Sequence, residues 1–363
     1  YQVFPSLFIN LLQRSPVRPP DAPERPDAPE EPAGPASAPD GAPEPLPASA
    51  RVEVPEALQG FRAGFVCLVG RPNTGKSTLT NALVGTKVAI TSGRPQTTRH
   101  NVRGVVHREG AQLVLVDTPG LHRPRTLLGR RLNDLVRETL ADVDVIAFCL
   151  PANERIGPGD RYIARDLAGL RAPVVAVVTK TDTVSRQALA AQLLAVDALG
   201  DWADIVPVSA VRGEQVGVLT DVLVSHLPPS PPLYPTGEVT DEPVEVMVAE
   251  LVREAALEGV RDELPHSLAV VVDEIVDPRS ARERGSRVKG SGNRLQVRVS
   301  LVVERDSQKA IVIGRGGARL KEVGVRARAG IERLLGRRVY LDLHVRTARD
   351  WQSDPRALAR LGF

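Results

Sequence analysis

Short apolar runs alternate with amphipathic stretches along the chain from Phe65 onward. The runs read FVCLVG, QLVLVD, VDVIAFCL, APVVAVVT and ADIVPVS, and the stretches between them have a helical period. Continuous apolar strands are typical of a mainly parallel sheet that helices cover on both faces. The pattern ends near His226 and therefore predicts an α/β domain over residues 61–226.

The pattern changes on either side of this domain. Residues 227–243, LPPSPPLYPTGEVTDEP, predict a stiff proline linker. Beyond it come helical EVMVAELVREAAL, strand-like SLAVVVDEIV and RLQVRVSLVVE, a helix–GRGG–helix unit and strand-like RRVYLDLHV, which predict an α+β domain over residues 244–363. Residues 1–60 are largely rich in Pro, Ala and acidic residues, and we expect a disordered N-terminal extension because they offer little apolar surface to bury.

Composition places the protein in an ordinary soluble class. The 363 residues are 42% hydrophobic and 25% charged, enough for two domains with separate cores. No apolar run approaches the ~20 residues of a membrane span. Cys67 and Cys149 both lie inside apolar runs, which favours buried thiols in a reducing cytoplasm over a disulfide or a metal site. These features predict a cytoplasmic protein.

The net charge of +3 conceals an uneven distribution. Residues 279–363 contain 21 Lys and Arg against 8 Asp and Glu, whereas residues 1–60 contain 4 against 9. A basic C-terminal third suggests a polyanionic partner. The basic loop 279–293, RSARERGSRVKGSGN, is either a solvated flexible loop or a contact for phosphates.

The segment GRPNTGKS, which begins at Gly70, matches a phosphate-binding loop between a predicted strand and a predicted helix. Its glycines let backbone N–H groups approach phosphate oxygens at a helix N-terminus. Lys76 would bridge the β- and γ-phosphates as a catalytic residue, and Ser77 would bind Mg²⁺. The candidate nucleotide contacts in this segment are Asn73, Thr74, Gly75, Lys76, Ser77 and Thr78.

The segment DTPG follows the next apolar run. Asp117 is a candidate for holding Mg²⁺ and Gly120 for meeting the γ-phosphate, although an isolated DTPG is also consistent with a simple turn. Between the two motifs lies RPQTTRH, where a threonine would bind Mg²⁺ only while the γ-phosphate is present. We favour Thr98 over Thr97 for this role; a polar surface loop is the alternative.

The tetrad TKTD nearly matches the guanine-reading signature NKxD, with Thr179 in place of Asn. Asp182 would accept hydrogen bonds from N1–H and N2–H₂ of guanine, a pair that adenine does not offer, which argues against an ATPase. Lys180 would stack on the base. Ser209 and Ala210, in SAVRG, would complete the site through the Ala210 N–H. Loss of the Asn should cost about 1 kcal/mol, less than the carboxylate contributes.

The predicted catalytic apparatus is less complete. Small GTPases place a water-orienting Gln just after the DTPG glycine, whereas Leu121 and His122 stand here. Leu121 cannot orient water, and His122 is either a surface side chain or the water-orienting group. We therefore expect slow intrinsic hydrolysis that a cation or partner assists. The alternative is a domain that binds guanine nucleotide with little turnover.

The segment IVIGRGGARL places a GxxG turn between two helical stretches. In KH domains such a turn brings backbone close to the phosphates of single-stranded RNA, whereas an ordinary glycine-rich helix–helix turn is the alternative. The basic local charge favours RNA. The candidate contacts are Ile313, Gly314, Arg315, Gly316, Gly317, Arg319 and Lys321. Aromatic residues make up 3% of the chain, so base stacking is not the main source of affinity.

The order of motifs resembles the Era family of bacterial ribosome-assembly GTPases over residues 61–363. The residues that carry the resemblance are GRPNTGKS, QTTRH, DTPGLH, TKTD, SAVRG, ELPHS, VERDSQKAIVIGRGGARLKEVG and DWQSDPRALARLGF. The resemblance implies a P-loop GTPase domain followed by a type II KH domain, with Mg²⁺ and GTP or GDP bound to the former. It also implies binding to the 3′ region of 16S rRNA and a role in maturation of the 30S subunit.

Two further properties are implied only by the resemblance. Potassium would assist hydrolysis through Asn73, and the protein would contact the membrane peripherally.

Thr179 departs from the family pattern and puts nucleotide affinity in question. The basic loop and the N-terminal extension look like additions, so the family assigns them no role.

Overall fold

The computed structural model describes residues 60–91, 98–121, 124, 126–258, 267–278 and 294–361. These residues belong to one compact unit. The predicted N-terminal extension up to residue 59 and the basic loop 279–293 lie outside the described residues. Among the described helices, none is long and apolar enough to cross a membrane.

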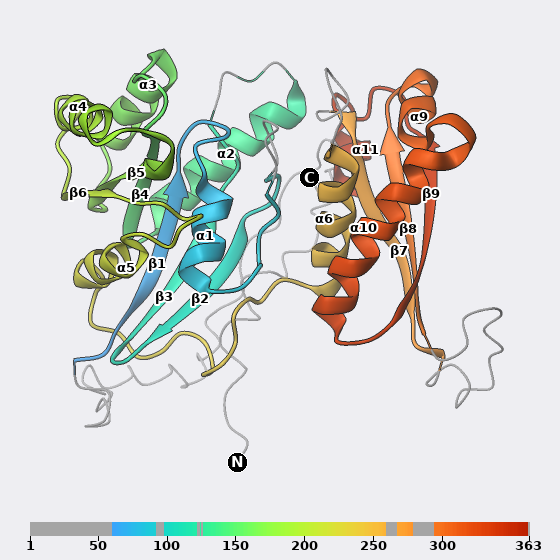
Figure 1. The fold of residues 1–363 in the computed structure, drawn as a ribbon, viewed down its shortest axis with the longest axis horizontal. Helices are drawn as coiled ribbons and strands as arrows, with labels where there is room; N and C mark the ends of the chain where they lie inside the picture. Colours follow the sequence, from blue (N-terminus) through green and yellow to red (C-terminus); the bar gives the residue numbers. More distant parts are fainter. Residues whose placement is uncertain are drawn as a thin grey trace, which may run out of the picture. The chain divides into compact units, whose positions relative to one another are not determined.

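The first half of this unit contains a six-stranded sheet in the order β2-β3-β1-β4-β5-β6 (Figure 1). Five of its strands run parallel, and β2 pairs antiparallel with β3 at one edge. The strands are β1 (Arg62–Val69), β2 (Val102–Arg108), β3 (Ala111–Asp117), β4 (Val145–Pro151), β5 (Val174–Thr179) and β6 (Asp204–Pro207). The sheet is the mainly parallel one that the apolar runs predict.

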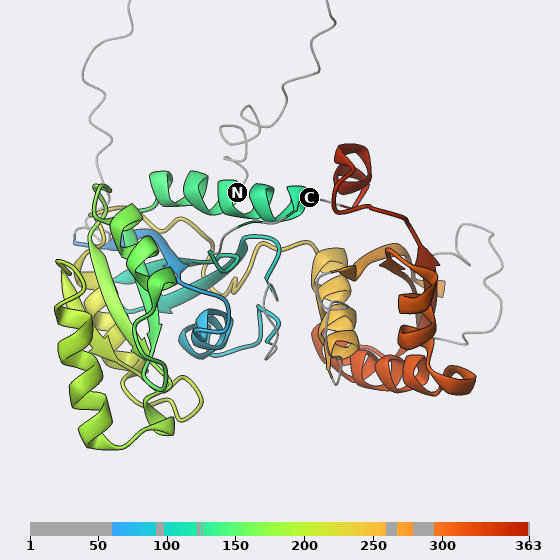
Figure 2. The same ribbon diagram turned by 90° about the horizontal axis from the view of Figure 1, so that it is seen from above.

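Helices cover both faces of this sheet. One buried cluster joins the strands to α1 (Lys76–Val84) and α5 (Val216–Ser225). A second cluster on the other face joins them to α2 (Leu127–Asp142), α3 (Pro158–Leu167) and α4 (Arg186–Asp197). Figure 2 shows α1, in blue, and α2, in green, on opposite sides of the sheet. Central strands buried on both faces explain why their sequences are apolar without alternation.

The proline-rich segment 227–243 is bound along the edge of the sheet. The backbone N–H of Val105 in β2 donates to Val239 O at 2.9 Å. The Gln112 side chain accepts hydrogen bonds from the N–H groups of Leu233 and Tyr234, at 2.7 and 2.9 Å. An edge strand leaves one row of backbone groups unpaired, and this segment supplies partners for part of that row. The predicted linker therefore forms a strap on β2 and β3.

The second half contains a three-stranded sheet in the order β7-β8-β9, with helices on one face (Figure 1). β7 pairs antiparallel with β8, and β8 pairs parallel with β9. Val252, Val323 and Ile331 are among the helix residues buried against the sheet. In chain order the elements are α6 (Val244–Leu257), β7 (Ala269–Val276), β8 (Leu295–Val303), α9 (Asp306–Ile313), α10 (Ala318–Leu335) and β9 (Val339–Thr347), and a short helix α11 (Pro355–Arg360) follows.

Candidate nucleotide and RNA sites

The phosphate loop connects the end of β1 to the start of α1. Gly70 and Gly75 both have positive φ, 156° and 95°. A Cβ on Gly70 would lie 2.7 Å from Cys149 O, so the backbone here approaches β4 more closely than a side chain allows. Helix α1 begins at Lys76, and Thr78 lies half-buried in its first turn. The loop thus presents a helix N-terminus, which favours an anion.

Lys76 is folded back over this loop. Its side chain is 6% exposed, and Nζ donates to the carbonyl oxygens of Gly70 and Arg71 at 3.3 and 3.0 Å. Burial lowers the pKa of Lys76, and the nearby charge of Asp117 opposes that shift. The ammonium group is therefore held at the loop, where it can compensate phosphate charge.

Three side-chain oxygens from separate segments meet beside the loop. Ser77 Oγ donates to Asp117 Oδ2 at 2.6 Å, and Thr98 Oγ1 donates to the same oxygen at 3.3 Å. The two hydroxyl oxygens are 3.0 Å apart. The structure thereby brings together the three residues that the sequence suggests for Mg²⁺. Thr97, the alternative to Thr98, lies outside the described residues.

The chemistry of this oxygen cluster fits a magnesium ion. Asp117 is fully buried at the end of β3, and burial raises the pKa of its carboxyl group to about 6. Among the described residues, its second oxygen, Oδ1, has no hydrogen-bond partner. A buried acceptor without a partner is costly, and hard oxygen donors are the ligands that Mg²⁺ prefers. Residues Ser77, Thr98 and Asp117 could hold the ion directly or through water.

The predicted guanine-reading residues lie at the ends of β5 and β6. Asp182 follows β5, and its Oδ1 accepts a hydrogen bond from Ser209 Oγ at 2.7 Å. This bond orients the carboxylate. Lys180 has a left-handed backbone with φ of 59°, and Ala210 directly follows Ser209 after β6. The four residues thus form one loop cluster next to the phosphate loop.

Thr179 compensates for the missing Asn by bonding to the phosphate loop. Its side chain is 3% exposed, and Oγ1 donates to Thr74 O at 2.6 Å. The bond joins the end of β5 to the loop that precedes α1. A Thr at this position therefore retains the tie between the two loops that an Asn would supply, through one short hydrogen bond.

The segment after β3 packs directly on the phosphate loop. A Cβ on Gly120 would lie 2.6 Å from Pro72 N, so only glycine fits there without a shift. Leu121 N donates to Gly70 O at 3.1 Å, and the Leu121 side chain is buried in the core. Leu121 is therefore turned away from any attacking water. His122 lies outside the described residues.

Charged residues that the motifs did not indicate surround this site. Arg71 donates to Asp160 at 2.7 Å and to Glu154 at 3.0 Å, and Lys180 Nζ lies 3.8 Å from Glu154. Glu154 thus links the phosphate loop to the guanine-reading loop. Sequence spacing could not reveal this link, because Glu154 comes from the β4–α3 connection and Asp160 from the first turn of α3, both outside every motif.

The GxxG turn joins α9 to α10 as the sequence predicts. Gly314, Gly316 and Gly317 all have positive φ, between 56° and 78°. A Cβ on Gly314 would lie 2.7 Å from Arg319 Cβ, so the turn is tight as well as left-handed. Arg315 and Lys321 are exposed, and Ile313 is half-buried. The backbone of the turn is thus accessible between two basic side chains.

Arg319 has a structural partner that the sequence did not indicate. Its Nη2 donates to the carbonyl oxygens of Ala256 and Glu258, at 3.3 and 3.0 Å. These carbonyls lie at the C-terminus of α6, where helices leave acceptors unpaired and favour a cation. Arg319 therefore fastens α6 to α10, which leaves fewer of its N–H donors for a nucleic acid than at exposed Arg315.

The chain matches two family models, one described as 50S ribosome-binding GTPase over residues 65–180 and one described as KH domain over residues 263–352. GTPase Era of Mycolicibacterium paratuberculosis is 66% identical over 306 residues, which are 84% of this chain and 99% of that relative. The chain belongs to the Era family of GTPases.

Other members of the Era family agree with this assignment. GTPase Era of Streptomyces coelicolor is 64% identical over 308 residues, covering 83% of this chain and 95% of that relative. A solved structure of Era in complex with MgGDPNP and nucleotides 1506–1542 of 16S ribosomal RNA is 35% identical, with a TM-score of 0.78. It covers 83% of this chain and 99% of that chain. Era membership confirms the resemblance drawn from the order of motifs, and with it the predicted fold class.

Proposed function

We propose that this chain is a GTP-hydrolysing switch that binds the 3′ region of 16S rRNA and assists maturation of the 30S ribosomal subunit. The similarity to the Era structure that contains MgGDPNP and 16S rRNA carries the proposal, because it spans both halves of the chain. The 50S ribosome-binding GTPase family resembles this chain over residues 65–180 alone, whereas the Era relatives resemble it over both halves and therefore favour the 30S subunit.

The proposed domains are a GTPase domain at residues 61–226, the strap at 227–243 and a KH domain at 244–363. In the GTPase domain the Asp182 carboxylate would accept hydrogen bonds from N1–H and N2–H₂ of guanine. The Ala210 N–H would donate a hydrogen bond to guanine O6. Lys76 would compensate the charge of the phosphates. When bound, Mg²⁺ would neutralise the phosphate charge that develops during hydrolysis, and Ser77, Thr98 and Asp117 would hold it.

The switch would depend on the γ-phosphate. Thr98 is the candidate magnesium ligand on the segment between GRPNTGKS and DTPG, and Gly120 packs against Pro72 of the phosphate loop. With GTP bound, the Thr98 hydroxyl would contact the magnesium ion and the Gly120 N–H would contact the γ-phosphate. With GDP bound, neither contact would form. RNA affinity would follow the nucleotide because RNA binding and GTP binding to one chain are thermodynamically linked.

Turnover measurements with and without RNA test this function. We expect multiple turnover of GTP at physiological potassium, accelerated by an RNA that corresponds to 16S nucleotides 1506–1542 but not by a scrambled RNA of equal length. Arg315→Glu or Lys321→Glu should weaken RNA binding about tenfold and reduce its salt dependence. Arg186→Glu, an equal charge change on exposed α4, should leave RNA binding unaltered.

A second candidate function has one observation in its favour. The burial of Leu121 removes the side chain at the usual water-orienting position. A constitutive RNA-binding protein whose G domain binds guanine nucleotide with little turnover fits that feature. Failure of the RNA to accelerate turnover, with RNA binding equal in GTP and GDP, would favour this candidate.

Two finer predictions come from the family alone. Potassium would assist hydrolysis through Asn73, which is exposed in the phosphate loop with a left-handed φ of 64°. Replacing potassium by sodium should then lower kcat, and Asn73→Ala should remove that difference. Peripheral membrane contact would appear as sedimentation of the protein with anionic vesicles, and absence of sedimentation would contradict it.

A further inference from the structure

Thr98 and Arg99 are neighbours in sequence that face different parts of the protein. Thr98 Oγ1 lies at the candidate magnesium site, 3.3 Å from Asp117 Oδ2. The Arg99 side chain is 1% exposed, and Nη1 donates to Leu268 O at 2.7 Å, just before β7. A single peptide bond thus separates Thr98, at the proposed magnesium site, from Arg99, which contacts the region that matches the KH family model.

Arg99 also lies over the ring of Trp351, with Cζ 5.8 Å from the ring centroid. An arginine guanidinium keeps its positive charge at neutral pH. A desolvated cation over an indole ring is one of the stronger cation–π arrangements.

The surroundings of Trp351 also include α2. The indole is fully buried, and Nε1 donates to Ser267 O at 3.1 Å. It packs in one cluster with Leu128 and Leu132 of α2, the helix that follows the DTPG turn. The backbone N–H of Leu128 donates to Gln352 O at 3.2 Å. The indole of Trp351 therefore shares one buried environment with Arg99 and with α2.

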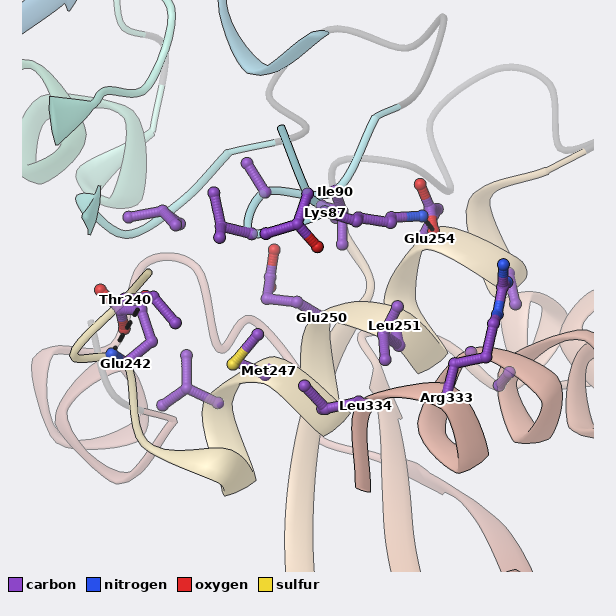
Figure 3. Close-up of a pocket in the computed structure, with 18 of the residues that line it drawn as sticks. Lys87, Ile90, Thr240, Glu242, Met247, Glu250, Leu251, Glu254, Arg333 and Leu334 are labelled. Atoms are coloured by element: carbon purple, nitrogen blue, oxygen red, sulfur yellow. Dashed lines mark hydrogen bonds and ion pairs between the residues drawn. The ribbon is translucent and has the colours of Figure 1, made fainter. Parts of the chain in front are cut away.

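Glu254 of α6 holds the segment that precedes Thr98 in sequence. Glu254 of α6 accepts hydrogen bonds from Thr91 N and Thr91 Oγ1, at 2.9 and 3.3 Å, and pairs with the Lys87 ammonium. Figure 3 shows Lys87 and Glu254 side by side at the edge of a cavity of about 640 Å³. Thr91 and Arg99 are thus each held by residues of the second half of the chain.

We propose that Arg99 and Trp351 position Thr98 for the magnesium ion of the GTP-bound state, so that the KH half completes the magnesium site of the GTPase half. The inference rests on the proposed function. Arg99 cannot follow a displaced Thr98 without leaving both the Leu268 carbonyl and the indole. Because coupling is reciprocal, whatever stabilises this arrangement of Trp351 would strengthen GTP binding, and GTP would strengthen the arrangement.

The test compares magnesium dependence in two nucleotide states. The readout is the Mg²⁺ concentration for half-maximal binding of a fluorescent non-hydrolysable GTP analogue and, separately, of fluorescent GDP. Trp351→Leu should raise the midpoint for the GTP analogue about tenfold and leave that for GDP unchanged, because Thr98 would contact the ion only with the γ-phosphate. Trp351→Phe, which keeps an aromatic face, should recover most of the difference.

Two further variants separate positioning from stability. Val323→Ala, in a different buried cluster of the KH half, should lower thermal stability without moving either midpoint. Trp351→Leu should add nothing to Thr98→Ala if it acts through that threonine. Equal shifts for the GTP analogue and GDP, or a full tenfold effect without Thr98, would overturn the inference. A wild-type protein that does not bind the GTP analogue would overturn the proposed function and this inference with it.

Discussion

The hydrogen bond of Thr179 to the phosphate loop makes a direct prediction. Thr179→Val keeps the volume and β-branching of the side chain but removes the hydroxyl that donates to Thr74 O at 2.6 Å. The site is 3% exposed, so water cannot readily replace the lost donor. The substitution therefore isolates one bond between the phosphate loop and the guanine-reading loop.

The expected cost follows from the burial of the acceptor. Leaving a buried carbonyl unsatisfied costs about 1–3 kcal/mol, compared with about 1 kcal/mol for an average hydrogen bond. Part of this cost lowers the stability of the nucleotide-free fold, since the bond is already formed there. The remainder is the cost of ordering the two loops around the nucleotide. We expect GTP and GDP affinity to fall about fivefold each, with the preference for guanine over adenine retained through Asp182.

Competition against a fluorescent guanine nucleotide measures both effects, with ATP as the third competitor. Thr183→Val is a matched control, because Thr183 Oγ1 makes a similar bond, to Lys180 O at 2.7 Å, at an exposed position of the same loop. The control should change affinity less than twofold, as expected for an exposed bond that water can replace. Wild-type affinity in Thr179→Val would refute the role given to this bond, and equal competition by ATP would refute guanine reading by Asp182.

Three other predictions concern the residues around the phosphates. Asp117→Asn should stabilise the nucleotide-free protein by up to about 3 kcal/mol at neutral pH, because it removes a carboxylate; burial raises the pKa of that group from 3.8 to about 6. The same substitution should weaken Mg²⁺-dependent GTP binding at least tenfold. The stability difference between the wild type and this variant should close as pH falls from about 6 toward 4, because the carboxyl group takes up its proton at a higher pH in the folded than in the unfolded protein. GTP binding by the wild type should weaken over the same pH range. Thermal unfolding and Mg²⁺ titrations at each pH measure both effects, and a stability difference that does not change with pH would contradict this cause. Gly120→Ala should reduce hydrolysis at least tenfold while GDP still binds, because its Cβ would meet Pro72, whereas Gly169→Ala, with open space, should be silent in the same assay.

Much of the nucleotide site could be predicted from short motifs. Lys76 and Ser77 follow β1 and open a helix, and Asp117 ends β3, the parallel neighbour of β1. Parallel strands place their carboxyl ends at one edge of the sheet, so these residues meet wherever that fold forms. The GxxG turn was predictable for a similar local reason, since its glycines are the residues that tolerate positive φ.

The partners of side chains between motifs were not predictable. Arg319 follows the GxxG turn and stays a candidate RNA contact, but no local pattern indicates that its guanidinium also bonds to the carbonyls that end α6. The prolines of residues 227–243 predict a stiff linker, but nothing in that pattern indicates that the segment also supplies a partner to the β2 edge. In both cases unsatisfied backbone groups of a remote element determine the contact, and no local pattern records them.

Sequence alone determined the fold class, the class of nucleotide and the family, because each depends on apolar periodicity or on motifs whose geometry is local. Tertiary structure decided how Thr179 replaces an Asn, because a 2.6 Å bond to Thr74 requires two loops 105 residues apart to meet. It also decided that Arg99, an ordinary basic residue by sequence, is buried between Leu268 and Trp351. Burial and long-range pairing arise only when the whole chain has folded, and they determine which charged side chains are held in place and which stay exposed for a ligand.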